Sequence, residues 1–189
     1  MNFISKLMIA MVSLFLIISC ATPKGDTNQE KVSHILKMKS ETLAELYQNK
    51  PETQSKVLKG AGYAVFSNIN TNLFLFSSGN GYGVAIDNSN GKKTYMKMNF
   101  LGLGPGIGVK DFRAVFVFKN KQVMNDFIES GWEFGGHADA AAKSGDKGAA
   151  AGGEMYIEDD IEIYQITEAG IALQATIAGT KYRKYADLN

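Results

Sequence analysis

Two stretches of alternating glycines decide the fold: FLGLGPGIGV at residues 100–109 and SSGNGYGVAI at residues 77–86. Over most of each stretch glycine occupies every second position, and larger side chains stand between. A period of two is the period of a β-strand, so each stretch is predicted to be a strand with one bare face. Because glycine inside a strand costs stability, the run indicates that another group lies close against that face. Pro105 further predicts an edge position or a bulge.

A nucleotide site competes with this interpretation, because Gly102, Gly104 and Gly106 can be aligned with a dinucleotide-binding fingerprint. That fingerprint needs a helix directly after the glycines and an acidic residue about twenty positions later. Here residues 113–118 follow, and they are typical of another strand. The GxxxxGK[ST] pattern of a phosphate-binding loop is also absent from the sequence. We therefore expect no nucleotide and no other cofactor.

The spacing of apolar residues in the rest of the chain predicts helices packed around a sheet. Amphipathic spacing indicates helices over residues 30–47, 49–59 and 121–131, and strands over 62–67, 74–77, 94–98, 113–118, 161–166 and 171–177. Residues 132–143 are ambiguous between helix and strand. Asn90 and Gly91 supply hairpin chemistry to a turn over 87–92. The expected class is α+β, with a mostly antiparallel, glycine-rich sheet that is strongly curved or barrel-like and has a few helices packed on it.

The first nineteen residues have the character of a processing segment. Lys6 is a short basic region, and the apolar run over 7–18 is shorter than the roughly twenty residues of a spanning helix. The next residues, Ile17 to Ser19 before the single cysteine Cys20, resemble a bacterial lipobox. The alternative is an ordinary secretory signal with an incidental cysteine.

The lipobox implies acylation of Cys20 and anchoring in a membrane, since several acyl chains anchor stably. We therefore expect a signal peptide at 1–19, a lipidated tether at 20–29 and one domain at 30–189. Ala21, in place of aspartate, resembles the pattern of lipoproteins sent to the outer membrane, where the domain faces the periplasm.

Charge excludes one class of partner. Removal of the leader takes away Lys6, which leaves 19 basic residues against 19 acidic ones. A neutral domain lacks the basic footprint of a nucleic-acid binder. Residues 92–121 nevertheless hold seven basic residues against one acidic residue, whereas 126–168 hold eleven acidic against two basic. The basic stretch either faces an anionic surface or consists of solvated strand edges and turns.

Catalytic and metal-binding candidates are few. His137 and Asp139 stand at strand spacing and point the same way, but no third ligand accompanies them; His34 lies within the first helix. A second group is the acidic cluster Glu158, Asp159, Asp160 and Glu162, which lacks the spacing and glycine of an EF-hand. We expect no metal site and no enzymatic activity, because a nucleophile, base and orienting group are not assembled.

The chain resembles the SYLF domain family, also called the Ysc84 actin-binding or lipid-binding family. The resemblance is carried by AGYAVFSNI (61–69), GNGYGVAI (79–86), GLGPGIGVKDFRAVFVFKNKQVMNDF (102–127), the alanine and glycine hairpin at 135–153, and IYQITEAGIALQATIAGT (163–180). It implies one α+β domain, a mostly antiparallel sheet curled towards a barrel, and lipid binding. The usual ending, an asparagine followed by paired tyrosines, is replaced here by KYRKY at 181–185.

In a bacterial envelope this resemblance implies affinity for anionic phospholipid headgroups, which need positive charge and donors. The candidate lipid-binding residues are Lys56, Lys59, Lys92, Lys93, Lys181, Arg183 and Lys184. The alternative function is a structural or scaffold lipoprotein that binds another envelope protein.

Overall fold

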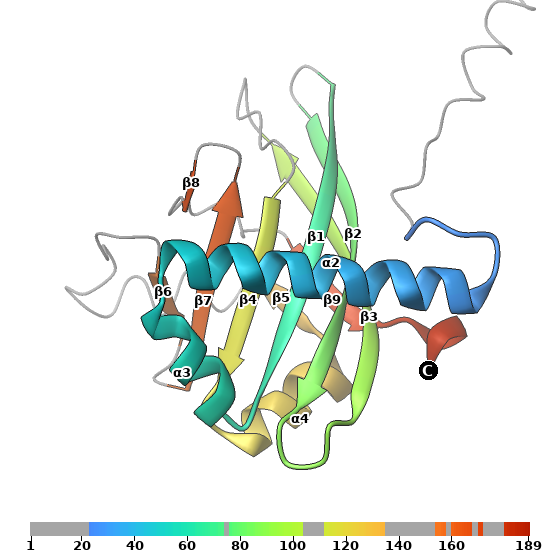
Figure 1. Cartoon of the computed structure of the whole chain (residues 1–189). Coiled ribbons are helices and arrows are strands. Elements are labelled where there is room, and N and C mark those ends of the chain that lie inside the picture. Colours follow the sequence, from blue (N-terminus) through green and yellow to red (C-terminus); the bar gives the residue numbers. More distant parts are fainter. Residues whose placement is uncertain are drawn as a thin grey trace, which may run out of the picture.

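The computed structural model describes residues 23–73, 76–103, 112–134, 154–157, 160–167, 170–171 and 180–189. A large antiparallel sheet carries helices on both faces (Figure 1). The helices are α2 (Asn28–Asn49), α3 (Glu52–Lys59), α4 (Lys121–Ser130) and the 3-10 turn η1 (Ala186–Leu188). The strands are β1 (Gly62–Leu73), β2 (Phe76–Asp87), β3 (Lys93–Leu103), β4 (Phe112–Phe118), β5 (Trp132–Phe134), β6 (Glu154–Ile157), β7 (Ile161–Thr167), β8 (Gly170–Ile171) and β9 (Thr180–Lys184). The predicted α+β class is confirmed.

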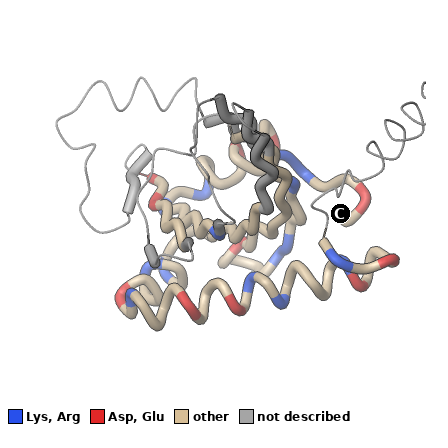
Figure 2. The backbone as a smooth tube through the Cα atoms, turned by 90° about the horizontal axis from the view of Figure 1, so that it is seen from above, with Lys and Arg blue, Asp and Glu red and all other residues tan. Residues whose placement is uncertain are grey.

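The strand order is β5-β9-β3-β2-β1-β4-β7-β6, with β8 paired to β7. Seen from above, the sheet follows an arc, and α2 runs along the outside of that arc (Figure 2). Among the described residues β5 and β6, at the two ends of the order, do not pair. The sheet is therefore curved, as predicted, but it is not closed into a barrel in the described part of the chain.

Successive side chains along each strand point to opposite faces of the sheet, so each face has its own hydrophobic core. Val65 and Val115 face α2 and α3, and we call this side of the sheet the outer face. Phe66 and Phe116 face α4, and we call this side the inner face. Because both faces are covered, the central strands are apolar at consecutive positions, which is typical of strands buried on both sides.

The bare face of the glycine strand is covered by an aromatic ring. Gly83 is the cross-strand partner of Phe66. A Cβ atom at Gly83 would meet the ring of Phe66 and the carbonyl oxygen of Val65. The expectation that a group packs directly against the glycines of residues 77–86 is thus confirmed at this position. Residues 104–111, which include the later glycines of the stretch at 100–109, lie outside the described residues.

The first helix begins earlier than predicted. Thr27 caps α2: its Oγ1 accepts from the N–H of Glu30 at 3.2 Å, and its own N–H donates to Oε2 of Glu30 at 3.0 Å. This reciprocal capping box fixes the start of α2 at Asn28. Pro23 is buried. The fold therefore already includes residues 23–29, most of the predicted tether.

Strands β3 and β9 also differ from the sequence-based prediction. Residues 93–103 form one continuous strand, β3, where separate strands over 94–98 and 100–109 were expected. The strand β9 was not predicted at all, because KYRKY reads as a basic tail. Among the described residues, no helix is both long and apolar enough to cross a bilayer.

Candidate functional site

The turn between β2 and β3 is built by its own backbone and by one glycine. The N–H of Gly91 donates to the carbonyl of Asp87 at 2.8 Å, and the N–H of Asp87 donates to the carbonyl of Lys92 at 3.0 Å. Gly91 has φ +71°, a conformation that side chains disfavour. The turn chemistry predicted from Asn90 and Gly91 is therefore confirmed.

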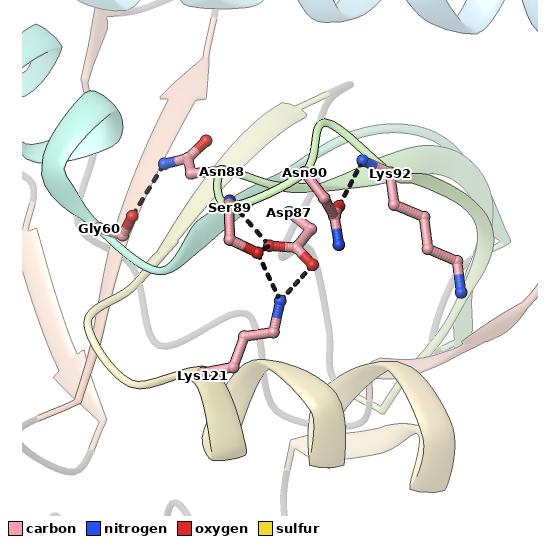
Figure 3. Close-up of polar contacts among 7 residues, drawn as sticks. All are labelled: Gly60, Asp87, Asn88, Ser89, Asn90, Lys92 and Lys121. Carbon is pink, nitrogen blue, oxygen red and sulfur yellow. Dashed lines mark hydrogen bonds and ion pairs between the residues drawn. The ribbon is translucent and has the colours of Figure 1, made fainter.

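Asn88 ties this turn to α3. Its Nδ2 donates to the carbonyl of Val57 at 2.7 Å and to that of Gly60 at 2.9 Å (Figure 3 draws the second bond). The last carbonyls of a helix have no partner within the helix, so an amide donor satisfies them well. The turn and the end of α3 are consequently one rigid unit.

Asp87 ties the same turn to α4. Its carboxylate accepts from the N–H of Ser89 at 3.0 Å, from the Ser89 hydroxyl at 2.7 Å, and from Nζ of Lys121 at the start of α4 (Figure 3). The hydrogen bonds from Lys121 and Ser89 lower the pKa of Asp87 to about 2. Asp87 is thus ionised at neutral pH and acts as a junction between turn and helix.

A depression of about 480 Å³ opens beside this junction. Its floor includes the largely buried Thr94, Met124 and Ile128. Its charged lining consists of Lys92, Lys93, Lys121 and Lys184 with Asp87 and Glu129. We call this the lysine pocket.

Half of these lysines are paired. Lys121 binds Asp87, and Lys184 binds Glu129. The hydrogen bond from Lys184 holds the pKa of Glu129 below its ordinary value. Lys92 and Lys93 are exposed and form no ion pair with any residue that the structure describes. The charge of Lys92 also acts on Glu129 and helps to lower its pKa. With four lysines and two carboxylates in its lining, the lysine pocket carries a net positive charge.

A second basic group lies on the outer face of β3 and β9. Lys97 is the cross-strand partner of Arg183, and Asn99 is the partner of Lys181. Lys181 and Arg183 are exposed, and Lys97 is half-buried, with its Nζ 4.0 Å from the ring centroid of Tyr185. We call Lys97, Lys181 and Arg183 the basic strand face. Like charges directly opposite one another repel, so an anion between them is favourable.

The third basic group has a structural partner. Lys56 of α3 lies 3.1 Å from a carboxylate oxygen of Glu162, and Lys119 lies 3.0 Å from the other. Burial alone raises the pKa of Glu162, but hydrogen bonds from Tyr164, Lys119 and Lys56 together lower it below its ordinary value. Lys59, the last residue of α3, is exposed.

The seven predicted lipid-binding residues are therefore not brought together at one site. Lys92, Lys93 and Lys184 meet in the lysine pocket, Lys181 and Arg183 lie on the basic strand face, and Lys56 and Lys59 lie on α3. Sequence reasoning missed Lys97 and Lys121. Lys97 stands two residues after Tyr95, a spacing that places both side chains on one face of a strand. Lys121 directly follows the helix cap Asn120, which places it at the start of a helix.

Other predicted features receive little structural description. Cys20, His137, Asp139, Glu158 and Asp159 lie outside the described residues. Within the described residues, no group of three or more His, Cys, Asp or Glu side chains is arranged to hold a metal ion.

Comparison with known proteins gives one clear similarity. No protein-family profile matches this chain. Over 147 residues the chain is 36% identical to Beta cell expansion factor A of Aeromonas veronii. The match covers 77% of this chain and 54% of that protein, so the chain spans about half the length of this curated relative.

Proposed function

We propose that this chain is a SYLF-like lipoprotein of the bacterial cell envelope whose domain binds anionic phospholipid headgroups through the basic strand face. Acylated Cys20 anchors it, on the periplasmic side of the outer membrane, and the role is non-enzymatic. One observation carries the proposal: Lys97 and Arg183 stand directly opposite each other on the outer face, without an acidic partner among the described residues.

The position of the basic strand face supports a membrane as the partner. The start of α2 and the C-terminus lie on one side of the molecule (Figures 1 and 2). Asn28 Nδ2 joins them by donating to the carbonyl of Asp187 at 2.7 Å. Cys20 precedes the buried Pro23 by three residues, which reach about 10 Å when extended. An acyl anchor at Cys20 thus holds this side of the domain near the bilayer.

The expected binding energy of the basic strand face is that of a contact which assists the acyl anchor. A basic residue near an anionic leaflet contributes about 1 kcal/mol, so Lys97 and Arg183 contribute roughly 2 kcal/mol together. Lys181 is not counted, because it stands opposite Glu133 of β5. Salt weakens this attraction, because Arg183 is exposed to solvent and Lys97 is half exposed. The acyl chains supply the anchoring, and the face orients the domain on the lipid.

The test is charge reversal on the unacylated chain that begins at Ala21. Lys97→Glu with Arg183→Glu is expected to weaken binding to vesicles of phosphatidylglycerol in phosphatidylcholine by about tenfold or more. The matched control is Lys59→Glu, which reverses an exposed lysine on α3. An equal loss in the control would contradict the proposal.

Binding of the unmodified chain to neither anionic nor zwitterionic vesicles would also contradict the proposal. That result would favour the alternative, a scaffold lipoprotein that binds another envelope protein.

A further inference from the structure

We propose that the lysine pocket is a binding site for a phosphate monoester, separate from the basic strand face. The two sites share no residue: Lys97, Lys181 and Arg183 do not line the pocket. The two sites can therefore be tested separately, and a failure of membrane binding through the basic strand face would not contradict this inference.

The charge balance of the pocket indicates a doubly charged anion. Four lysines face two carboxylates, and two of the lysines, Lys121 and Lys184, are bound to Asp87 and Glu129. The remaining two, Lys92 and Lys93, are exposed neighbours where the turn ends and β3 begins. A phosphate monoester carries between −1.5 and −2 at pH 7, whereas a carboxylate or a phosphate diester carries only one negative charge. The charge of a phosphate monoester therefore matches the excess of two lysines over carboxylates in the pocket.

Neutral donors complete the recognition of a phosphate. Asn90 and Asn125 line the pocket with Thr94. Asn90 uses Oδ1 to accept from the N–H of Lys92 at 2.8 Å, and its amide nitrogen is turned towards α4 (Figure 3). Phosphate oxygens are strong acceptors that bind ammonium and amide donors together. The pocket therefore offers more than a cluster of surface charges.

The frame of the pocket is already in place. Asn88 fixes the turn to α3, and Asp87 fixes it to α4 through Lys121 (Figure 3). Lys92 and Asn90 are thus attached to a rigid turn, which lowers the ordering cost of binding.

The size and apolar lining of the pocket leave room for the organic part of an ester. A volume of about 480 Å³ lies within the usual range of small-molecule sites. The apolar side chains of Met124 and Ile128 form part of the lining. A carbon skeleton attached to the phosphate can pack there. The monoester can belong to a soluble metabolite or to a phosphatidate headgroup, which has the same chemistry.

The test uses glycerol 3-phosphate as the soluble probe and phosphatidate vesicles as the lipid probe, with the unacylated chain. Calorimetry is expected to detect glycerol 3-phosphate, and the double variant Lys92→Gln with Lys93→Gln is expected to weaken its affinity about tenfold or more. The matched control is Lys97→Gln with Arg183→Gln, which leaves the pocket lining unchanged. Circular dichroism of both variants checks the fold.

The charge state of the ligand supplies a second readout. The second ionisation of a phosphate monoester has a pKa near 6, so the ligand loses negative charge and its affinity is expected to fall from pH 7.5 to pH 5.5. Dimethyl phosphate, a diester, is expected to bind far more weakly.

The results with the two probes distinguish a soluble phosphate monoester from a phosphatidate headgroup. Binding of glycerol 3-phosphate that depends on Lys92 and Lys93 supports a soluble ester. Dependence on these lysines only for phosphatidate vesicles supports the lipid source. Absence of binding by both probes, equal binding of the diester, or an unchanged double variant would overturn the inference.

Discussion

Phe66 lies over Gly83, its partner on the neighbouring strand, and its ring occupies the space that a side chain at Gly83 would need. The same ring packs edge-on against Tyr182 at 4.6 Å between centroids and against Phe116 at 5.6 Å. The glycine thus lets the central strands seat a cluster of aromatic rings between the sheet and α4. This packing explains how Gly83 supports the fold although glycine is a weak strand residue.

Substitution of Gly83 by alanine is expected to destabilise the protein by about 2 kcal/mol, because the added Cβ meets the Phe66 ring and a backbone oxygen. Urea unfolding monitored by circular dichroism measures the change. The control is Gly91→Ala, where no atom lies within 4 Å of the added Cβ and only the φ of +71° opposes it. We expect about 1 kcal/mol there. A fully stable Gly83→Ala variant would contradict this packing.

Tyr182 is expected to matter for the fold as much as any central strand residue. It is fully buried and lies 5.2 Å from Phe116 and 5.5 Å from Phe127 between ring centroids. Tyr182→Ala is therefore expected to cost about 4 kcal/mol in unfolding free energy. Tyr185→Ala is the comparison and is expected to cost less, because Tyr185 lies outside this cluster of rings and its ring contacts Lys97. An equal, small loss for both would show that β9 is dispensable.

The junction between Asp87 and Lys121 predicts a defined pH dependence. The pKa of Asp87 is lowered to about 2 in the fold, from about 3.9 in an unfolded chain. Its contribution to stability is therefore complete above about pH 4 and is lost as the pH falls towards 2. Asp87→Asn is expected to cost about 1 kcal/mol at pH 7 and much less near pH 2.

Chemical denaturation at pH 7, 4 and 2.5 measures this difference for Asp87. Glu41→Gln, in the exposed pair with Lys37, is the control and is expected to have little effect at any pH. A cost for Asp87→Asn that is the same at every pH would rule out ionisation as its source.

Glu162 accepts from two lysines and one tyrosine hydroxyl, so Glu162→Gln removes the negative charge that these three groups share. Glu162→Gln is expected to cost about 2 kcal/mol, less than a fully buried pair, because the side chains of Lys56 and Lys119 are 35% and 47% exposed. Thermal unfolding compared with that of the exposed-site variant Lys59→Gln provides the measurement. Equal melting temperatures would refute a structural role for Glu162.

Local periodicity was enough to predict the sheet, its antiparallel class and the crowded glycine face, because these depend on residues close in sequence. The helix start at Asn28 was missed although the capping residues Thr27 and Glu30 were visible. The strand β9 was missed because its alternation is short and its charges dominate: only Thr180 and Tyr182 are buried.

The candidate site was harder to predict, because charge neutralisation is a matter of tertiary contact. Lys121 and Asp87 are 34 residues apart, and Lys56 meets Glu162 from a different part of the chain. The sequence therefore gave no means of separating the basic residues that form ion pairs from the others.

The most direct measurement is flotation of the unacylated chain, from Ala21 onwards, with anionic and zwitterionic vesicles at low and high salt. Binding to phosphatidylglycerol vesicles at low salt, lost at high salt and absent with phosphatidylcholine alone, is the result expected from the basic strand face. Failure to float with either vesicle, or binding that ignores both lipid charge and salt, would contradict recognition of anionic headgroups by the folded domain.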